Sequence, residues 1–249
     1  MHPVLFKIGS VTIRTYGVLV ATGFFVAFFL LYREAKRKNF YAHKILDLEL
    51  VILVFGILGA RALHVLVNLD FYSKNLLEAF FIWRGGLAFL GGFILAILAC
   101  AAFALKNKMP LWEVGDFISP YMALGHAIGR IGCFLNGCCF GKVAAWPFLG
   151  VVFPGDTAYR YPTQLYASFL LLCTFIILKV AEERPHASGS VFAFYLLLYS
   201  GMRFFVDFLR GDNPTYIFGL TVSQLISAAI FTIAIFLLVL RRKYGRDKD

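Results

Sequence analysis

Four polar residues near the end of one apolar stretch fall on a single face of a helix. They occur in "YSGMRFFVDFLRGD", where Tyr199, Arg203, Asp207 and Arg210 are spaced by four, four and three residues. At about 100° per residue they occupy a sector of roughly 80°. A purely structural interpretation is an ion pair between Arg203 and Asp207, four residues apart. Because an ionisable residue inside a membrane span is costly, the whole stripe predicts a functional face lining a cavity.

Another arginine, Arg130, lies in a segment rich in glycine and cysteine, "GRIGCFLNGCCFG", at residues 129–141. Glycine in a membrane helix permits the close approach of a neighbouring helix or a ligand. A further arginine, Arg61, occurs in "GARALHVL". Arginine binds phosphate oxygens with its planar fork and stays charged when buried. Arg61, Arg130 and Arg203 therefore predict an anion site, and a phospholipid headgroup is the obvious anion in a membrane.

The cysteines suggest two further kinds of site. An odd number of thiols without regular spacing does not indicate a small disulfide scaffold. Cys133, Cys138 and Cys139, with His126, could bind zinc, although no second CxxC pair is present. A redox pair of Cys138 and Cys139 is a further alternative, although adjacent cysteines form a disulfide only with strain. We expect no metal and interpret most of the thiols as small apolar residues. The five are Cys100, Cys133, Cys138, Cys139 and Cys173.

The amino-acid composition indicates that these residues lie in a membrane protein. The chain has 249 residues, of which 60 % are hydrophobic and 15 % charged, and its mean hydropathy is +0.77. Soluble domains are about half apolar and about a quarter charged. The formal net charge of +10 could suggest nucleic acid. The densest basic runs flank apolar stretches, however, which favours orientation in a membrane and contact with anionic headgroups. We expect no nucleic-acid partner and no cleavable signal peptide.

The apolar stretches predict an all-α integral membrane protein, because about 20 apolar residues cross the hydrocarbon core. Basic residues concentrate in the first connection, "REAKRKN", and in the C-terminal tail, which predicts an external N-terminus and a cytoplasmic C-terminus. We expect a single transmembrane bundle over residues 1–249, with a longer external connection at about 136–162. About seven spans are expected, at roughly 16–32, 46–66, 86–105, 114–135, 163–180, 190–209 and 219–240.

These motifs together resemble the prolipoprotein diacylglyceryl transferase family. The centre of the match is "GRIGCFLNGCCFGK", an arginine in a Gly-rich segment followed by Asn-Gly. Any one block alone is a weak signal, whereas the ordered set covers most of the chain. The other blocks, in family order, are "TYGVLVATGF", "GARALHVL", "WRGGLAFLGG", "YPTQLYAS" and "YSGMRFFVDFLRGD".

The resemblance implies a seven-span fold in the bacterial cytoplasmic (inner) membrane, with the active site toward the outer leaflet. It implies transfer of a diacylglyceryl group from phosphatidylglycerol to the lipobox cysteine thiol of a preprolipoprotein. A thioether forms and glycerol 1-phosphate leaves. Phosphatidylglycerol and the preprolipoprotein signal peptide are then the partners, and no metal or organic cofactor is expected.

The resemblance also assigns roles to particular residues. Arg130, Arg203 and Tyr16 are expected to be catalytic, with the two arginines holding the phosphate. Asp207 is expected to orient Arg203. The expected substrate-binding residues are Arg61, Asn136, Gly141, Tyr199, Asp207, Arg210, Gly85, Gly86, Gly91 and Gly92.

Two departures from the family pattern keep other interpretations open. Leu90 stands where several relatives carry a histidine that could act as a base, and Ala167 replaces a common glutamate. His64 or His126 could be a base instead, or the positive field of the arginines could lower the pKa of the substrate thiol. A second interpretation is a diverged homologue that binds phospholipid or signal peptide without catalysis, or that uses another acceptor. A third is a transporter or channel, because charged helix faces also line transport pathways, although no inverted repeat is visible.

Overall fold

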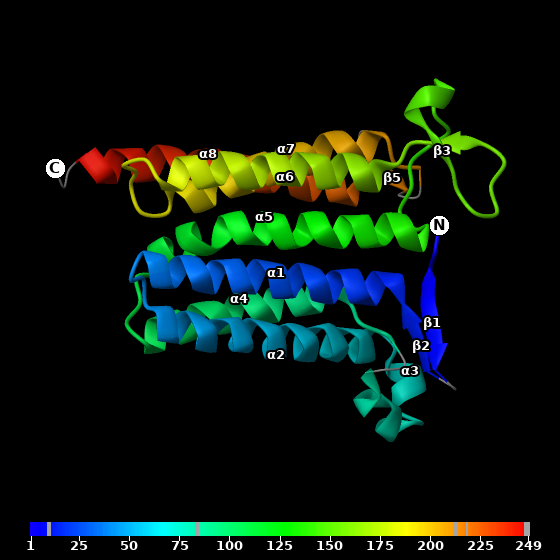
Figure 1. Cartoon of the computed structure of the whole chain (residues 1–249), viewed down its shortest axis with the longest axis horizontal. Coiled ribbons are helices and arrows are strands. Elements are labelled where there is room, and N and C mark those ends of the chain that lie inside the picture. The colour runs from blue at the N-terminus through cyan, green and yellow to red at the C-terminus, as the bar shows by residue number, and fades with distance from the viewer. Residues whose placement is uncertain (9–10, 83–84, 212–213, 218, 247–249) are drawn as a thin grey trace. The chain divides into compact units, whose positions relative to one another are not determined.

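The computed structural model is almost entirely helical and describes residues 1–8, 11–82, 85–211, 214–217 and 219–246 (Figure 1). The helices are α1 (Thr15–Arg37), α2 (Ala42–Val67), α3 (Leu69–Tyr72), α4 (Phe89–Lys106), α5 (Leu111–Asn136), α6 (Thr163–Glu182), α7 (Ser190–Phe208) and α8 (Val222–Arg246), with short 3-10 helices η1 (Leu76–Phe80) and η3 (Pro147–Leu149). The prediction of a helical fold is confirmed.

Each expected span corresponds to one long helix, with bounds that differ by several residues. Five of the described helices, α1, α2, α6, α7 and α8, are long and apolar enough to cross a membrane. Residues Leu90–Lys106 of α4 form a shorter apolar helix. The helix α1 continues to Arg37, past the expected end, because basic side chains interact favourably with the C-terminal end of a helix dipole.

Three short antiparallel hairpins, which the sequence analysis did not predict, accompany the helices. Strand β1 (Val4–Ile8) pairs with β2 (Val11–Arg14), β3 (Val151–Val152) with β4 (Tyr159–Arg160), and β5 (Thr215–Ile217) with β6 (Leu220–Thr221). The second hairpin lies in the connection that the sequence marked as the longest. Strands of two to five residues are too short for an alternating pattern to identify them.

Large apolar side chains are exposed along the helices. Phe25, Phe29, Phe169, Phe205 and Phe236 each expose more than half of their surface. Soluble monomers rarely expose extensive apolar surface, whereas a membrane helix presents such side chains to lipid. The exposed phenylalanines therefore agree with the composition.

The chain divides into two compact units, of which one comprises Tyr32–Val114. In this unit α2 and α4 pack closely through small residues. A side chain added at Gly59 would meet the backbone of Gly91, and one added at Gly92 would meet the backbone of Gly56. Small residues allow such backbone contact between membrane helices.

The other unit comprises Met1–Leu31 and Gly115–Asp249. Figure 1 shows α6, α7 and α8 side by side, and α7 contacts both of the others. The carboxylate of Asp116 accepts hydrogen bonds from the backbone N–H groups of Gly189 (2.6 Å) and Phe192 (2.7 Å), which caps the start of α7. The hydroxyl of Ser168 on α6 donates to the carbonyl of Ala127 on α5 at 2.9 Å. These contacts position the helices that build the candidate site.

Candidate functional site

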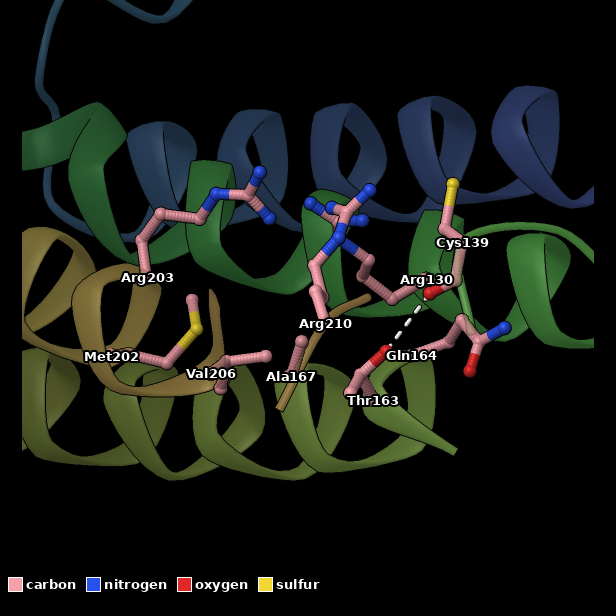
Figure 2. A pocket seen from close by; sticks show the side chains of 9 residues that line it. All are labelled: Arg130, Cys139, Thr163, Gln164, Ala167, Met202, Arg203, Val206 and Arg210. Carbon is pink, nitrogen blue, oxygen red and sulfur yellow. Dashed lines mark hydrogen bonds between the residues drawn. The ribbon is translucent and has the colours of Figure 1, made fainter. Parts of the chain in front are cut away.

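A small pocket lies where α5 ends, α6 begins and α7 ends (Figure 2). Its residues come from segments far apart in the sequence, and three of them are arginines. The lining consists of Arg130 from α5, Cys139 from the connection after α5, Thr163, Gln164 and Ala167 from α6, and Met202, Arg203, Val206 and Arg210 from α7 and the residues just after it.

Arg130 is held by the histidine one helical turn before it. Its Nε donates to Nε2 of His126 at 3.2 Å, which the four-residue spacing on α5 permits. The ring of His126 lies 5.5 Å from the ring of Tyr199, centroid to centroid. Because Nε2 of His126 accepts this bond, that nitrogen carries no proton. The imidazole therefore restricts the guanidinium of Arg130, which faces the pocket.

The polar stripe of α7 forms an ion cluster centred on Asp207, whose side chain is fully buried. Its carboxylate lies 3.5 Å from Nη2 of Arg203 and 3.9 Å from Nε of Arg210, and it accepts a hydrogen bond from the hydroxyl of Thr221. Nε of Arg203 also donates to the hydroxyl of Ser223 at 2.9 Å. The ion pair and the pocket, which were alternatives at the level of the sequence, are therefore present together.

The pocket has an excess of positive charge. Arg203 lies within electrostatic range of both Arg130 and Arg210. Three guanidinium groups meet one carboxylate, that of Asp207, among the described residues. Guanidinium groups in such a cluster are the preferred partners of phosphate oxygens.

The connection after α5 begins with a helix-ending turn that folds the chain back onto α5. Gly137 has a φ of 73°, a left-handed conformation that glycine adopts readily. Its N–H donates to the carbonyl of Phe134 at 3.0 Å, and the N–H of Cys138 donates to the carbonyl of Cys133 at 3.2 Å. This is the Schellman pattern. It returns Cys138 to the side of Cys133, and hydrogen bonds with the thiols of Cys133 and Cys139 lower the pKa of the Cys138 thiol from its ordinary value.

The same connection is then clamped between the start of α6 and the end of α7. The N–H of Gly141 donates to the carbonyl of Tyr161 at 2.8 Å, and the N–H of Lys142 donates to the carbonyl of Leu209 at 2.7 Å. A Cβ at Gly141 would lie 2.6 Å from the carbonyl oxygen of Leu209. Gly141 was predicted to bind substrate; the structure places it in this clamp, next to Arg210 in a β-bridge.

The first two residues of α6 hold the cysteine backbone. The hydroxyl of Thr163 donates to the carbonyl of Cys139 at 2.8 Å (Figure 2), and the side-chain amide of Gln164 donates to the carbonyl of Cys138. The other atom of that amide, Oε1, is buried and has no hydrogen-bond partner among the described residues. A buried acceptor without a partner is costly, so this oxygen calls for a water or a ligand as its donor.

Thr163 and Gln164 belong to the block "YPTQLYAS", but neither was predicted as a site residue from the sequence. The available signal was a pair of hydrogen-bonding side chains at the start of an apolar span. Cys139, Met202 and Val206 were also missed as lining residues, and for the two apolar residues no chemical signal exists.

Arg61 occupies a different environment, in the unit Tyr32–Val114. Its guanidinium donates to the carbonyls of Glu78 (2.5 Å), Ala79 (2.8 Å), Gly85 (2.7 Å) and Gly86 (2.9 Å). Both glycines have positive φ angles, of 91° and 76°. Arg61, Gly85 and Gly86, which were predicted separately, therefore form one arrangement that fixes the loop before α4. Participation of Arg61 in the anion site stays a prediction.

The other predicted residues lie outside the set that lines the pocket. Tyr16 lies in the first turn of α1 beside Gly132 of α5, Asn136 ends α5, and Tyr199 contacts His126. Gly91 and Gly92 lie on the face of α4 that packs against α2. A role for these residues in binding or catalysis stays a prediction. Trp83 and Arg84 of the third sequence block, and Asp212 of the last, lie outside the described residues.

Comparison with known proteins agrees with the ordered sequence blocks. A family model described as prolipoprotein diacylglyceryl transferase matches residues 3–240. The chain belongs to this family. The resemblance stated from the sequence is thereby confirmed. Together with five helices able to cross a membrane, membership identifies the chain as a multi-pass membrane protein.

Individual relatives in the prolipoprotein diacylglyceryl transferase family match over nearly their whole length. Three proteins named phosphatidylglycerol–prolipoprotein diacylglyceryl transferase illustrate this. The Finegoldia magna protein is 36 % identical over 98 % of this chain and 97 % of its own length. The Pediococcus pentosaceus protein is 33 % identical over 100 % of this chain and 93 % of its own. The Streptococcus mutans protein is 33 % identical over 98 % of this chain and 96 % of its own length.

Proposed function

We propose that the chain transfers the diacylglyceryl group of phosphatidylglycerol to the lipobox cysteine thiol of a preprolipoprotein. A thioether forms and glycerol 1-phosphate is released. The full-length similarity to relatives of that name supports the reaction. The observation that carries it on this chain is the pocket lined by Arg130, Arg203 and Arg210, with Asp207 between the last two.

The charge of this pocket suits the leaving group better than the bound lipid. A phosphodiester carries one negative charge, and a second develops on its oxygen as the bond between the glyceryl carbon and that oxygen breaks. Among the described residues the pocket lining contains three guanidinium groups and no carboxylate, and Asp207 beside it pairs with Arg203 and Arg210. This predominance of positive charge suits the developing dianion. Interactions that are stronger in the transition state than in the ground state accelerate the reaction.

The arginines are already oriented before a substrate arrives. Arg130 is restrained by His126, and Arg203 by Ser223 and Asp207. Fixed donors do not have to reorganise as charge develops, so they stabilise it more than mobile ones. The contact of Asp207 with Arg203 supports the predicted role of Asp207 in orienting that arginine.

Gln164 supplies a contact for the glycerol headgroup. Its amide nitrogen donates to the carbonyl of Cys138, which leaves Oε1 as a buried acceptor without a partner among the described residues, and Gln164 is one of the residues that line the pocket. A hydroxyl of the headgroup is a donor that this oxygen can accept from. The three arginines disfavour a cationic headgroup in the same place.

In the chemical step, the sulfur of the acceptor attacks the glyceryl carbon. The carbon–oxygen bond breaks and its electron pair passes to the phosphate oxygen, while the thiol proton goes to solvent. The positive field of the arginines favours the thiolate. Nε2 of His126 is not the base that takes this proton, because it already accepts a hydrogen bond from Nε of Arg130.

We further propose that α1, α2, α4, α5, α6, α7 and α8 are seven spans of one bundle in the bacterial inner membrane. The basic residues at the C-terminal ends of α1 and α8 support an external N-terminus and a cytoplasmic C-terminus. In this topology the end of α5, the start of α6 and the end of α7 all lie on the outer side. The pocket would then open toward the outer leaflet.

The test uses the purified full chain in detergent with phosphatidylglycerol and a lipobox peptide, following glycerol phosphate release and the peptide mass. We expect coupled release and a diacylglyceryl mass gain. Arg130→Ala should lower the rate by about 10²–10³-fold, the usual effect of removing one charge-stabilising donor. Arg33→Ala, at an exposed position on α1, is the matched control and should retain the rate.

Two outcomes would contradict the proposal. If Arg130→Ala and Arg33→Ala have equal activity, the arginine pocket is not the phosphate site. If the wild type binds phosphatidylglycerol but forms no product, the chain is a diverged homologue that has kept the lipid site and lost the chemistry.

A further inference from the structure

Three cysteine thiols meet at the edge of the arginine pocket. The sulfur atoms of Cys133, Cys138 and Cys139 all lie within 4.8 Å of one another. Cys139 also lines the pocket with Arg130, Arg203 and Arg210. From the sequence, zinc binding by these cysteines was one alternative and no metal was expected, because the C-x4-C-C spacing by itself does not show that the three thiols converge.

The convergence is built by the backbone on both sides of the cluster. The Schellman turn at Gly137 brings Cys138 back to Cys133, and α6 then holds the carbonyls of Cys138 and Cys139 through Gln164 and Thr163. Cys139 has a φ of 62°, a conformation that is unfavourable for a residue with a Cβ. A thiol is thus placed at a position where the backbone favours glycine.

We propose that Cys133, Cys138 and Cys139 bind a thiophilic metal cation of the Zn²⁺ class through three thiolates, and that its fourth coordination position takes the thiol of the acceptor substrate. The first part rests on the cluster alone. The second part rests on the proposed transferase function.

The distances suit such a site with little movement. Tetrahedral zinc with Zn–S bonds of about 2.3 Å places its sulfur ligands about 3.8 Å apart. Sulfurs already within 4.8 Å of one another therefore have to approach by about 1 Å. Thiolate ligands also select zinc and other soft cations over magnesium and calcium, which prefer oxygen.

The charges around the three cysteines also suit a metal site. Three thiolates and a divalent cation carry one net negative charge. Arg130 stands one helical turn before Cys133 and lines the same pocket as Cys139, so its guanidinium balances that charge and favours the thiolate form.

The fourth coordination position of the metal would activate the acceptor thiol. A thiol that coordinates a metal cation loses its proton, here to solvent. The resulting thiolate attacks the glyceryl carbon, the carbon–oxygen bond breaks, and the electron pair leaves on the phosphate oxygen beside the arginines. This arrangement would supply an activated nucleophile to a chain whose Leu90 cannot act as a base.

The binding test is a Co²⁺ titration of the reduced full chain in detergent, after treatment with a chelator and its removal. We expect thiolate-to-cobalt charge-transfer absorption that saturates at one equivalent and disappears on addition of Zn²⁺. Cys133→Ser, Cys138→Ser and Cys139→Ser should each weaken binding more than about tenfold. Cys100→Ser on α4 and Cys173→Ser on α6 remove one thiol elsewhere and should bind like the wild type.

The absence of the charge-transfer band would overturn the proposal. So would equal losses in the cluster variants and in the two controls, or a disulfide among the three cysteines of the protein as isolated. Thermal unfolding of each variant, measured without metal, separates a loss of ligands from a loss of folding.

The acceptor part is tested with a lipobox peptide added to the Co²⁺ form without lipid. The peptide should increase the charge-transfer intensity, and the same peptide with serine for cysteine should not. Full turnover by metal-free protein would overturn this part and leave the proposed function intact. Absence of turnover in both forms, with the cobalt band present, would refute the function and leave the metal site standing.

Discussion

Gly141 allows a direct test of how the pocket is positioned, because one added methyl group would disturb its clamp. A Cβ at this residue would lie 2.6 Å from the carbonyl oxygen of Leu209, 2.8 Å from Cβ of Tyr161 and 3.0 Å from Cγ2 of Thr163. Ordinary contacts begin near 3.4 Å, so in Gly141→Ala the chain must move by about 0.8 Å from Leu209. Leu209 directly precedes Arg210, which carries the movement into the pocket.

The size of the effect follows from that movement. Overpacking a well-packed region typically lowers the free energy of unfolding by about 1–3 kcal/mol. A misplacement of about 1 Å in a catalytic arrangement can lower the rate by about 10²-fold. We therefore expect Gly141→Ala to remain folded, to unfold at a lower temperature, and to transfer diacylglyceryl groups about 10²-fold more slowly.

The assay is release of glycerol phosphate together with the mass gain of a lipobox peptide. Gly201→Ala on α7 is the matched control, because the nearest atom to its added Cβ is a ring carbon of Phe231 at 3.6 Å, an ordinary contact. Its rate should stay within about twofold of the wild type, since a tolerated Ala costs a helix nothing relative to Gly. Equal rates for Gly141→Ala and Gly201→Ala would refute the argument that this packing positions Arg210.

Two further predictions concern carboxylates. Asp207→Asn keeps the shape of a buried side chain but removes the negative charge that faces Arg203 and Arg210. Because the arginines then lose their buried counter-charge, we expect this variant to destabilise the protein by about 3 kcal/mol. An unchanged unfolding temperature in detergent would contradict this expectation. The guanidinium of Arg160 lowers the pKa of Asp156, whose carboxylate also accepts from the two backbone N–H groups that follow it. The Asp156 carboxylate therefore stabilises the hairpin turn fully at a pH above about 3.9, the pKa of an aspartate in the unfolded chain. This stabilisation is lost as the pH falls through the lower pKa that Asp156 has in the folded protein. Hydrogen exchange of those two amides should be faster in Asp156→Asn at neutral pH, and equal exchange in both proteins would argue against the cap.

The apolar runs and the local motifs determined much of this protein by themselves. Twenty or so apolar residues form a helix in lipid because no water is present to satisfy the backbone, so each expected span became a long helix. The stripe that contains Arg203, Asp207 and Arg210 could be placed from a 100° rotation per residue. Its ion cluster is local, and a local contact is visible in the sequence. The same holds for Arg130, whose contact with His126 depends only on a four-residue spacing.

The tertiary structure alone decided which distant groups meet. The side-chain nitrogen of Gln164 reaches the carbonyl of Cys138, and its buried oxygen has no partner in the part of the chain that the structure describes. Gly141 is required where three segments meet, and Arg61 donates to loop carbonyls of its own unit. The physical reason is common to all three. Their partners are set by how whole helices end and pack, and no spacing within one segment specifies a contact with another.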